Sequence, residues 1–230
     1  VGSEMCIRDS SVTLYEKKGS VGGLLEFANN VKGPHENLSV LRSYFERQME
    51  VLGVNVMLNT EATADIIAEA SPDIVIAATG GVRDTLGLSD TAGTKVVGID
   101  DFMMADIAEE VVIVGSNVQA IDAAMYLLAQ GKHVQVVTPN AASAIGAGHS
   151  FWVKTFTQPN MKALGVRFWP EATVTAVNDG SVTVKTATGI EQEIACGTVV
   201  EALDCLPNDS LSTGLSCEVV TVGDAARPFN

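Results

Sequence analysis

The chain has 230 residues, enough for one large domain or two small ones, and its apolar share of 47% can build a hydrophobic core. Its 28 acidic and 14 basic residues give a formal charge of −14, which argues against a nucleic-acid surface or an attachment to acidic membranes. No apolar run approaches the roughly 18 residues of a membrane-spanning helix. We therefore expect neither nucleic acid nor a membrane as a partner.

The cysteines and histidines give no pattern of a metal site. The four cysteines form no C-x-x-C pair, and the three histidines are scattered without ligand spacing. We expect no metal, no disulfide framework and a reducing, cytoplasmic location. The residues concerned are Cys6, Cys196, Cys205, Cys217, His35, His133 and His149.

The first ten residues, VGSEMCIRDS, differ from the rest because they show neither strand alternation nor helical spacing. They resemble a translated sequencing adapter, and a native irregular N-terminus is the alternative. We leave residues 1–10 out of the fold prediction, and expect native sequence upstream of Ser11 to be missing.

From Ser11 the pattern is strand, helix, strand, helix, strand. In chain order we expect a strand at 12–15, a glycine-rich loop at 19–23, a helix at 38–52, a strand at 54–58, a short helix at 63–69 and a buried strand within 73–80 that ends in a turn. Gly53 ends the long helix. Glu16 stands at the tip of the first strand, where a Rossmann domain places the acid that binds ribose hydroxyls.

A second unit begins near Lys95. Its expected elements are a buried strand at 111–114, a helix from the turn at 115–120 to Gly131, a strand at 133–137, a helix at 151–164, a strand at 166–169 and hairpin strands at 174–177, 181–186 and 192–195. Buried strands return at 198–202 and 219–224. The simplest topology inserts residues 95–196 into a domain formed by 11–94 and 197–230. The predicted fold is α/β, with two Rossmann-like doubly wound domains and a β-meander.

The segment 115–120, GSNVQA, follows a strand and opens a helix, as the phosphate loop of a dinucleotide-binding domain does. Gly115 permits the tight turn, and Ala120 can stand for the third glycine. Asn117 occupies the position of the second glycine, where a side chain should weaken or reshape the contact with a pyrophosphate. The candidate cofactor-binding residues here are Gly115, Ser116, Asn117, Gln119 and Ala120.

The next strand leaves NAD(P)H binding open. It ends at Thr138-Pro139, with no acid to hold an NAD ribose and no arginine to mark NADP. The pattern thus indicates a Rossmann fold, whereas nicotinamide binding and a nucleotide-like domain kept for packing remain alternatives. The glycine motif that should precede Glu16 by about 20 residues does not fit before it, so we expect the first domain to be incomplete.

Six segments together resemble one family, the 2,4-dienoyl-CoA reductase and trimethylamine dehydrogenase group of NADH:flavin oxidoreductases. They are E-K-x4-G-G-x-L at 16–25, L-R-S-Y-F-E-R-Q at 41–48, L-G-V at 52–54, D-x-V-x-A-x-T-G at 73–80, P-N-D at 207–209 and G-D-A at 223–225. The resemblance spans nearly all of residues 11–230.

The resemblance implies an FAD-type domain at 11–94 and 197–230, incomplete here, with an inserted NAD(P)-type domain at 95–196. It implies electron transfer between a nicotinamide or a carrier protein, FAD, an iron–sulfur cluster and FMN, the last two in an N-terminal barrel absent from this chain. Glu16 would bind the adenosine ribose, and Asp224 the ribityl or pyrophosphate region. The FAD-binding positions carried over are Glu16, Lys17, Gly22, Gly23, Leu24, Thr79, Gly80, Gly223 and Asp224.

The leading hypothesis is therefore the FAD/NAD(P)-binding part of a flavin-dependent oxidoreductase, an enzyme in which the cofactors carry the chemistry and no catalytic acid–base residue is expected. One alternative is a non-catalytic nucleotide-binding or docking module of an amine dehydrogenase, because residues 202–205 read A-L-D-C where the family commonly has a second A-T-G-like turn. Another is the small-subunit glutamate synthase type of NADPH–FAD electron donor. The absence of a C-x4-C pair argues against a disulfide reductase.

Overall fold

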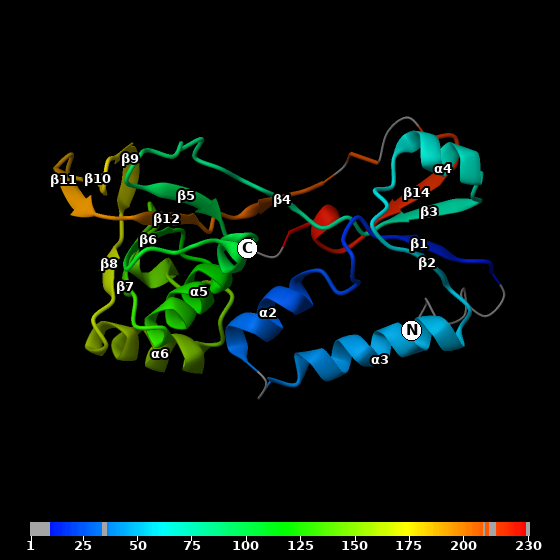
Figure 1. Ribbon diagram of the computed structural model, residues 1–230, viewed down its shortest axis with the longest axis horizontal. Helices are drawn as coiled ribbons and strands as arrows, with labels where there is room; N and C mark the ends of the chain where they lie inside the picture. Colours follow the sequence, from blue (N-terminus) through cyan, green and yellow to red (C-terminus); the bar gives the residue numbers. More distant parts are fainter. Residues whose placement is uncertain (1–9, 34–35, 209, 212–214, 229–230) are drawn as a thin grey trace. The chain divides into compact units, whose positions relative to one another are not determined.

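The computed structural model of the chain describes residues 10–33, 36–208, 210–211 and 215–228. Apart from Ser10, the segment 1–10 lies outside the described residues. The chain falls into two units, which are described separately: unit 1 is Val1–Ala77 with Asp209–Thr221, and unit 2 is Ala78–Asn208 with Val222–Asn230. Figure 1 shows the order of the elements along the chain.

Unit 2 is built on a five-stranded parallel sheet with the order β5-β12-β6-β7-β8. The strands are β5 (Lys95–Gly98), β6 (Glu110–Val114), β7 (His133–Val137), β8 (Arg167–Trp169) and β12 (Thr198–Glu201). From β8 to β12 the order matches the 3-2-1-4 of a doubly wound nucleotide-binding sheet. The expected α/β class with parallel strands is confirmed.

Helices cover one face of this sheet, and an antiparallel meander packs on its other face (Figure 1). The helices are α5 (Val118–Ala129) and α6 (Phe151–Ala163), and the meander is β9 (Ala172–Asn178), β10 (Ser181–Thr186) and β11 (Glu191–Ala195). Side chains alternate between the faces of a strand, so Val112 and Val114 of β6 reach the meander core, which includes Val182 and Val184. Coverage on both faces explains why β6 reads as an unbroken apolar run.

The expected helices and strands of this unit are found within a few residues, including the turn at Asp179-Gly180 between two antiparallel strands. The observed units divide the chain at other residues than expected, because unit 2 also takes in residues 78–94, residues 197–208 and the stretch from Val222. β12 was expected with the first domain because it follows residue 196, whereas it pairs with β5 on one side and β6 on the other. Its register partners come from distant parts of the chain, and such pairings leave no local sequence pattern.

Cys196, just before β12, is buried in the core of unit 2. Its thiol donates a hydrogen bond to the Thr198 carbonyl, and burial raises the pKa of the thiol to about 11. Because the thiolate is the reactive form, we expect Cys196 to resist iodoacetamide at pH 8 in the native chain and to react after unfolding in guanidinium. Peptide mass spectrometry would measure the labelling; labelling of native Cys196 as fast as of the unfolded chain would contradict the burial.

The described residues of unit 1 form four parallel strands in two separate pairs. β1 (Thr13–Tyr15) pairs with β2 (Asn55–Met57), and β3 (Ile74–Ala77) pairs with β14 (Glu218–Thr221). Its helices are α2 (Leu24–Lys32), α3 (Leu38–Val51) and α4 (Ala64–Ala70). The sequence pattern missed α2, which starts directly after the glycine-rich loop.

Burial in unit 1 is shallow compared with unit 2. Among its described residues, Ile67 and Ala77 are the fully buried apolar side chains, while Ile74 and Ile76 of β3 are largely exposed. Parallel strands are normally covered on both faces, whereas the described part of this unit leaves apolar side chains of β3 exposed. None of the described helices of either unit is long and apolar enough to cross a membrane.

Candidate functional site

The loop between β6 and α5 requires glycine at position 115. Gly115 adopts φ of 143°, and its N–H donates to the Val137 carbonyl at 2.9 Å. A Cβ at this position would collide with the carbonyl oxygen of Ala202 and lie 2.8 Å from its carbonyl carbon. Gly115 is therefore fixed by the close approach of the chain that leaves β12, as well as by the turn itself.

Asn117 caps α5 and ties its start to the segment after β12. Its Oδ1 accepts a hydrogen bond from the Ala120 N–H at 3.0 Å, as an N-cap residue does. Its Nδ2 donates to the Ala202 carbonyl at 3.1 Å and to Asp204 Oδ1 at 3.0 Å. With 9% exposure the side chain is turned into the protein. Its role in the structure is thus to hold two loops together.

The neighbouring polar residues are also engaged with one another. Ser116 is buried, and its Oγ accepts a hydrogen bond from Asn140 Nδ2 at 3.0 Å. Thr138 is buried at the end of β7, and its hydroxyl accepts a hydrogen bond from the Asn140 N–H. The place of the ribose-binding acid is thus taken by Thr138 and Asn140. Gln119 is half-buried in the first turn of α5.

The position of this loop fits a phosphate group, whereas its side chains do not supply a ribose acceptor. The Ile121 N–H donates to the Asn117 carbonyl, and the Ala120 N–H donates to Asn117 Oδ1. The N–H groups of residues 118 and 119, which come before them, have no partner within the helix. Helix starts of this kind attract anions. The loop also lies beside the boundary between β6 and β12, where the strand order of the parallel sheet reverses, and this is the usual ligand position in such folds.

In unit 1 the expected FAD residues lie at two places. Glu16 follows β1, its N–H bonds to Met57, and its Oε1 accepts the N–H of Lys18 at 2.8 Å. Lys17 is exposed. Gly22 and Gly23 have positive φ of 122° and 49° and lead into Leu24, the first residue of α2, with no side-chain cap at Gly23. Both places therefore offer polar groups, a carboxylate and backbone amides, that an FAD could use.

In unit 2 the other FAD candidates are brought together by a two-stranded ribbon, β4 (Val82–Arg83) with β13 (Cys205–Leu206). Gly80, with φ of 73°, precedes β4, and a Cβ on Gly81 would lie 2.7 Å from that of Cys205. Asn208, beyond β13, donates its N–H to Ala225 in the short helix η4 (Gly223–Ala225). The turn at Thr79-Gly80 and the segment Gly223-Asp224 thus adjoin the same ribbon.

The electrostatics of this ribbon are governed by burial and acids. Burial raises the pKa of the Cys205 thiol, the nearby Arg83 guanidinium lowers it, and Asp224 is among the acids that raise it. Arg83 holds Asp100 with two hydrogen bonds of 3.1 Å. Within the described residues no cluster of three or more His, Cys, Asp or Glu is arranged for a metal ion.

Asp204 and Asn140 complete the glycine-loop contacts, and neither was predicted as a site residue. Asp204 was noticed only as a departure from a second turn motif, and Asn140 follows a proline in a loop without a recognisable pattern. Their partners, Asn117 and Ser116, lie tens of residues away in the chain. No local signal could have found these pairs.

A sequence profile described as pyridine nucleotide-disulphide oxidoreductase matches residues 73–202, more than half of the chain. The chain belongs to this family. Members of the family are oxidoreductases, and the matched range contains the whole β6–α5–β7 unit with its glycine loop.

Individual relatives agree with this membership. Cinnamate reductase of Clostridium sporogenes is 32% identical over 133 residues, covering 57% of this chain and 20% of that protein. NADH oxidase of Thermoanaerobacter brockii is 33% identical over 136 residues, covering 56% and 21%. A solved complex of 2-naphthoyl-CoA reductase with 2-naphthoyl-CoA superimposes with a TM-score of 0.84 at 28% identity, over 98% of this chain and 34% of that one.

The resemblance to the 2,4-dienoyl-CoA reductase and trimethylamine dehydrogenase group of flavin oxidoreductases is confirmed by these matches. The chain spans about a fifth of the length of the two curated relatives and a third of the solved structure.

Proposed function

We propose that this chain is the dinucleotide-binding, electron-transfer part of a flavin-dependent oxidoreductase, passing electrons between a nicotinamide or a carrier protein and FAD. The observation that carries the proposal is the β6–α5–β7 unit. Its loop at Gly115 leads into a helix whose first N–H groups can bind an anion, and it lies where the strand order of the parallel sheet reverses. Relatives named as NADH oxidase and cinnamate reductase support a redox role. Electrons would continue to an iron–sulfur cluster and an FMN-bearing barrel outside this chain.

The proposal assigns FAD to residues 11–94 and 197–230 and the nicotinamide to residues 95–196, except that β12, which pairs with β5 and β6, is moved from the first domain to the second. Glu16 would accept hydrogen bonds from the adenosine ribose, and backbone amides at Gly22, Gly23 and Leu24 would lie along the dinucleotide. Thr79-Gly80 and Gly223-Asp224, which adjoin one ribbon, would contact its pyrophosphate and ribityl parts.

The chain's own residues would bind and orient, since redox chemistry of this kind resides in the cofactor. FAD, when bound, supplies the ring that accepts a hydride or single electrons. The carboxylate of Glu16, held by the Lys18 N–H, would fix the adenosine end. The N–H groups at the start of α5 would hold the phosphates of a nicotinamide dinucleotide.

Flavin spectroscopy on the natural full-length protein tests this proposal. We expect purified protein to show flavin absorbance and extracted FAD, and anaerobic NADH or NADPH to bleach it. Protein that contains no FAD would contradict the proposal. In a third outcome, the FAD is reduced by dithionite but by neither NADH nor NADPH. That result would leave a carrier protein as the electron partner and favour the second candidate function, described next.

The second candidate is a non-catalytic nucleotide-binding or docking module, favoured by Asn117, which engages three groups of its own chain. If the glycine loop serves packing alone, Asn117→Gly should leave NADH affinity unchanged. A gain of about tenfold, or 1.4 kcal/mol, with Asn117→Gly but not with Asn117→Ala would show that the loop is a working nicotinamide site. Isothermal titration with NADH measures both variants, and the Ala variant controls for loss of the cap.

A further inference from the structure

A groove of about 890 Å³ opens between α5 and α6, away from the glycine loop. Its lining includes Glu110, His133 and Arg167, which lie at the starts of β6, β7 and β8, whereas Gly115 and Thr138 follow the strand ends. Dinucleotides bind at the carboxyl ends of such strands. The groove is therefore separate from the proposed cofactor site, and an inference from it does not depend on the proposed function.

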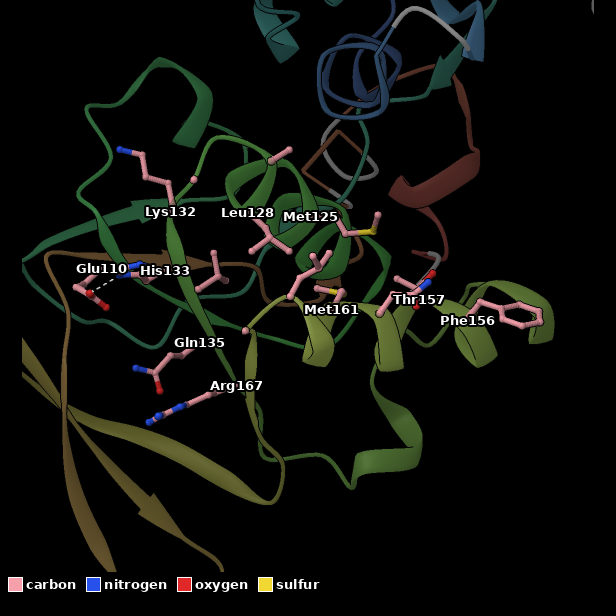
Figure 2. A pocket seen from close by; sticks show the side chains of 16 residues that line it. Glu110, Met125, Leu128, Lys132, His133, Gln135, Phe156, Thr157, Met161 and Arg167 are labelled. Atoms are coloured by element: carbon pink, nitrogen blue, oxygen red, sulfur yellow. Dashed lines mark hydrogen bonds and ion pairs between the residues drawn. The ribbon is translucent and has the colours of Figure 1, made fainter.

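The floor of the groove is apolar and follows helical spacing. Leu128 and Ala129 of α5 lie one turn after Met125, and Met161 of α6 is buried and lines the same groove. Figure 2 shows Met125, Leu128 and Met161 along the groove, with Phe156 at one end and Glu110 and His133 at the other. Met125, Phe156 and Leu164 are 47%, 60% and 67% exposed. These side chains are too exposed to serve the core of unit 2.

The surroundings of the groove are cationic, in contrast to the rest of the chain. Residues 123–170 contain no Asp or Glu, although the whole chain has 28 in 230 residues. The same stretch, which forms most of α5, β7, α6 and β8, carries four permanent cations, Lys132, Lys154, Lys162 and Arg167. Lys132 and Arg167 line the groove itself.

The remaining titratable groups of the groove are one pair. His133 Nδ1 lies 2.7 Å from Glu110 Oε1, and this hydrogen bond raises the pKa of the imidazole. Glu110 is thus engaged with a neighbour on the protein, and Lys132 and Arg167 set the charge that an incoming partner meets. Lys132 Nζ donates to the Ile107 carbonyl at 2.8 Å, which anchors its side chain at the groove edge.

We propose that the α5–α6 groove binds an amphipathic helix of a partner protein whose apolar stripe is flanked by acidic residues. Apolar anchors on two neighbouring helices match the way a single helix lies in a groove, with contacts at i, i+3, i+4 and i+7. The cationic rim, formed by Lys132 and Arg167, favours an acidic occupant by charge complementarity. The helix α6, with 13 residues, matches an occupant of about four turns.

Fluorescence anisotropy with labelled model peptides tests the proposal on the natural full-length protein. The probe is an amphipathic helix of about 16 residues, with Leu at i, i+3, i+4 and i+7 repeats and Glu beside them. One matched peptide has Lys for Glu, and another has Ser for Leu. We expect the Leu/Glu peptide to bind most tightly, with an affinity that falls as salt rises.

Variants of the chain locate the binding. We expect Met125→Glu to weaken the Leu/Glu peptide about tenfold by removing an anchor, and Arg167→Glu about fivefold by reversing a rim charge. Lys185→Glu, at an exposed position of the meander strand β10, is the matched charge control and should change binding less than twofold. Circular dichroism melts check that each variant is folded, and the exposed Arg167 site keeps the test valid if Met125→Glu unfolds.

Several results would overturn the proposal: no binding of the Leu/Glu peptide, equal binding of the Leu/Lys or Ser/Glu peptide, or equal loss in the Lys185→Glu control. Sedimentation equilibrium gives one more. If the chain self-associates and Met125→Glu abolishes this, the groove is an interface between copies and the acidic partner helix is wrong.

Discussion

Replacing Gly115 by Ala should lower the free energy of unfolding of unit 2 by about 3 kcal/mol or more. The new Cβ meets the Ala202 carbonyl group, which is backbone and is held by the Ala202 N–H bond to Val114 at 2.8 Å. An L-residue with φ of 143° is strained in addition. Neither cost can be relieved by rotating a side chain, so the end of β12 must move.

Gly131→Ala is the matched control, because Gly131 has φ of 80° but a Cβ there has nothing within 4 Å. We expect it to cost about 1 kcal/mol from backbone strain alone. Both tryptophans, at positions 152 and 169, lie in unit 2, so urea unfolding followed by tryptophan fluorescence reports on this unit. Equal losses in the two variants would show that contact with Ala202 is unimportant.

The second large effect concerns unit 1. We expect the 230-residue chain alone to be colourless after purification, to bind FAD poorly and to aggregate, because β1 and β3 each have a described partner on one side only. Unpaired strand edges beside exposed apolar side chains recruit other chains. A monodisperse yellow preparation would contradict this expectation.

Two isoleucines of unit 1 provide the comparison. Ile76 of β3 is 63% exposed, whereas Ile67 of α4 is 5% exposed. Ile76→Lys should make the chain more monodisperse in size-exclusion chromatography with light scattering, since a lysine blocks edge-to-edge pairing. Ile67→Lys should make unit 1 more sensitive to limited proteolysis, because it buries an unpaired charge. If Ile76→Lys made unit 1 as sensitive to proteolysis as Ile67→Lys does, this would contradict the exposure of the Ile76 side chain.

The sequence predicted the parts of the fold that depend on local pattern. The β6–α5–β7 unit, the meander and α3 follow from apolar periodicity and turn residues, and the strand 133–137 was placed at its observed bounds. Helix α2 was missed because its start lies in a glycine-rich loop and its middle contains Asn29 and Asn30. The place of β12 was missed because its register with Lys95–Gly98 is set by tertiary pairing.

In the candidate site too, the sequence predicted the positions that depend on local motif spacing and missed the side-chain contacts with distant residues. Gly115 and Ala120 were expected from motif spacing, and the turn conformation and the buried start of α5 agree with their positions. Asn117 was expected to disturb a pyrophosphate contact, while its observed bonds run to Ala120, Ala202 and Asp204. A side chain's direction depends on what the distant chain places beside it, and the sequence contains no signal for that.

The place of β12 between β5 and β6 has a consequence for how unit 2 is made. The ribosome releases β6, α5, β7, α6, β8 and the whole meander before residues 198–201 emerge. Until then β5 and β6 have no neighbour between them, and the sheet is open at its middle. Pairing of strands so far apart in sequence is slow. The last strand of this sheet to be synthesised therefore closes it, and a chain that stops before residue 198 leaves two apolar edges open at the centre of the sheet.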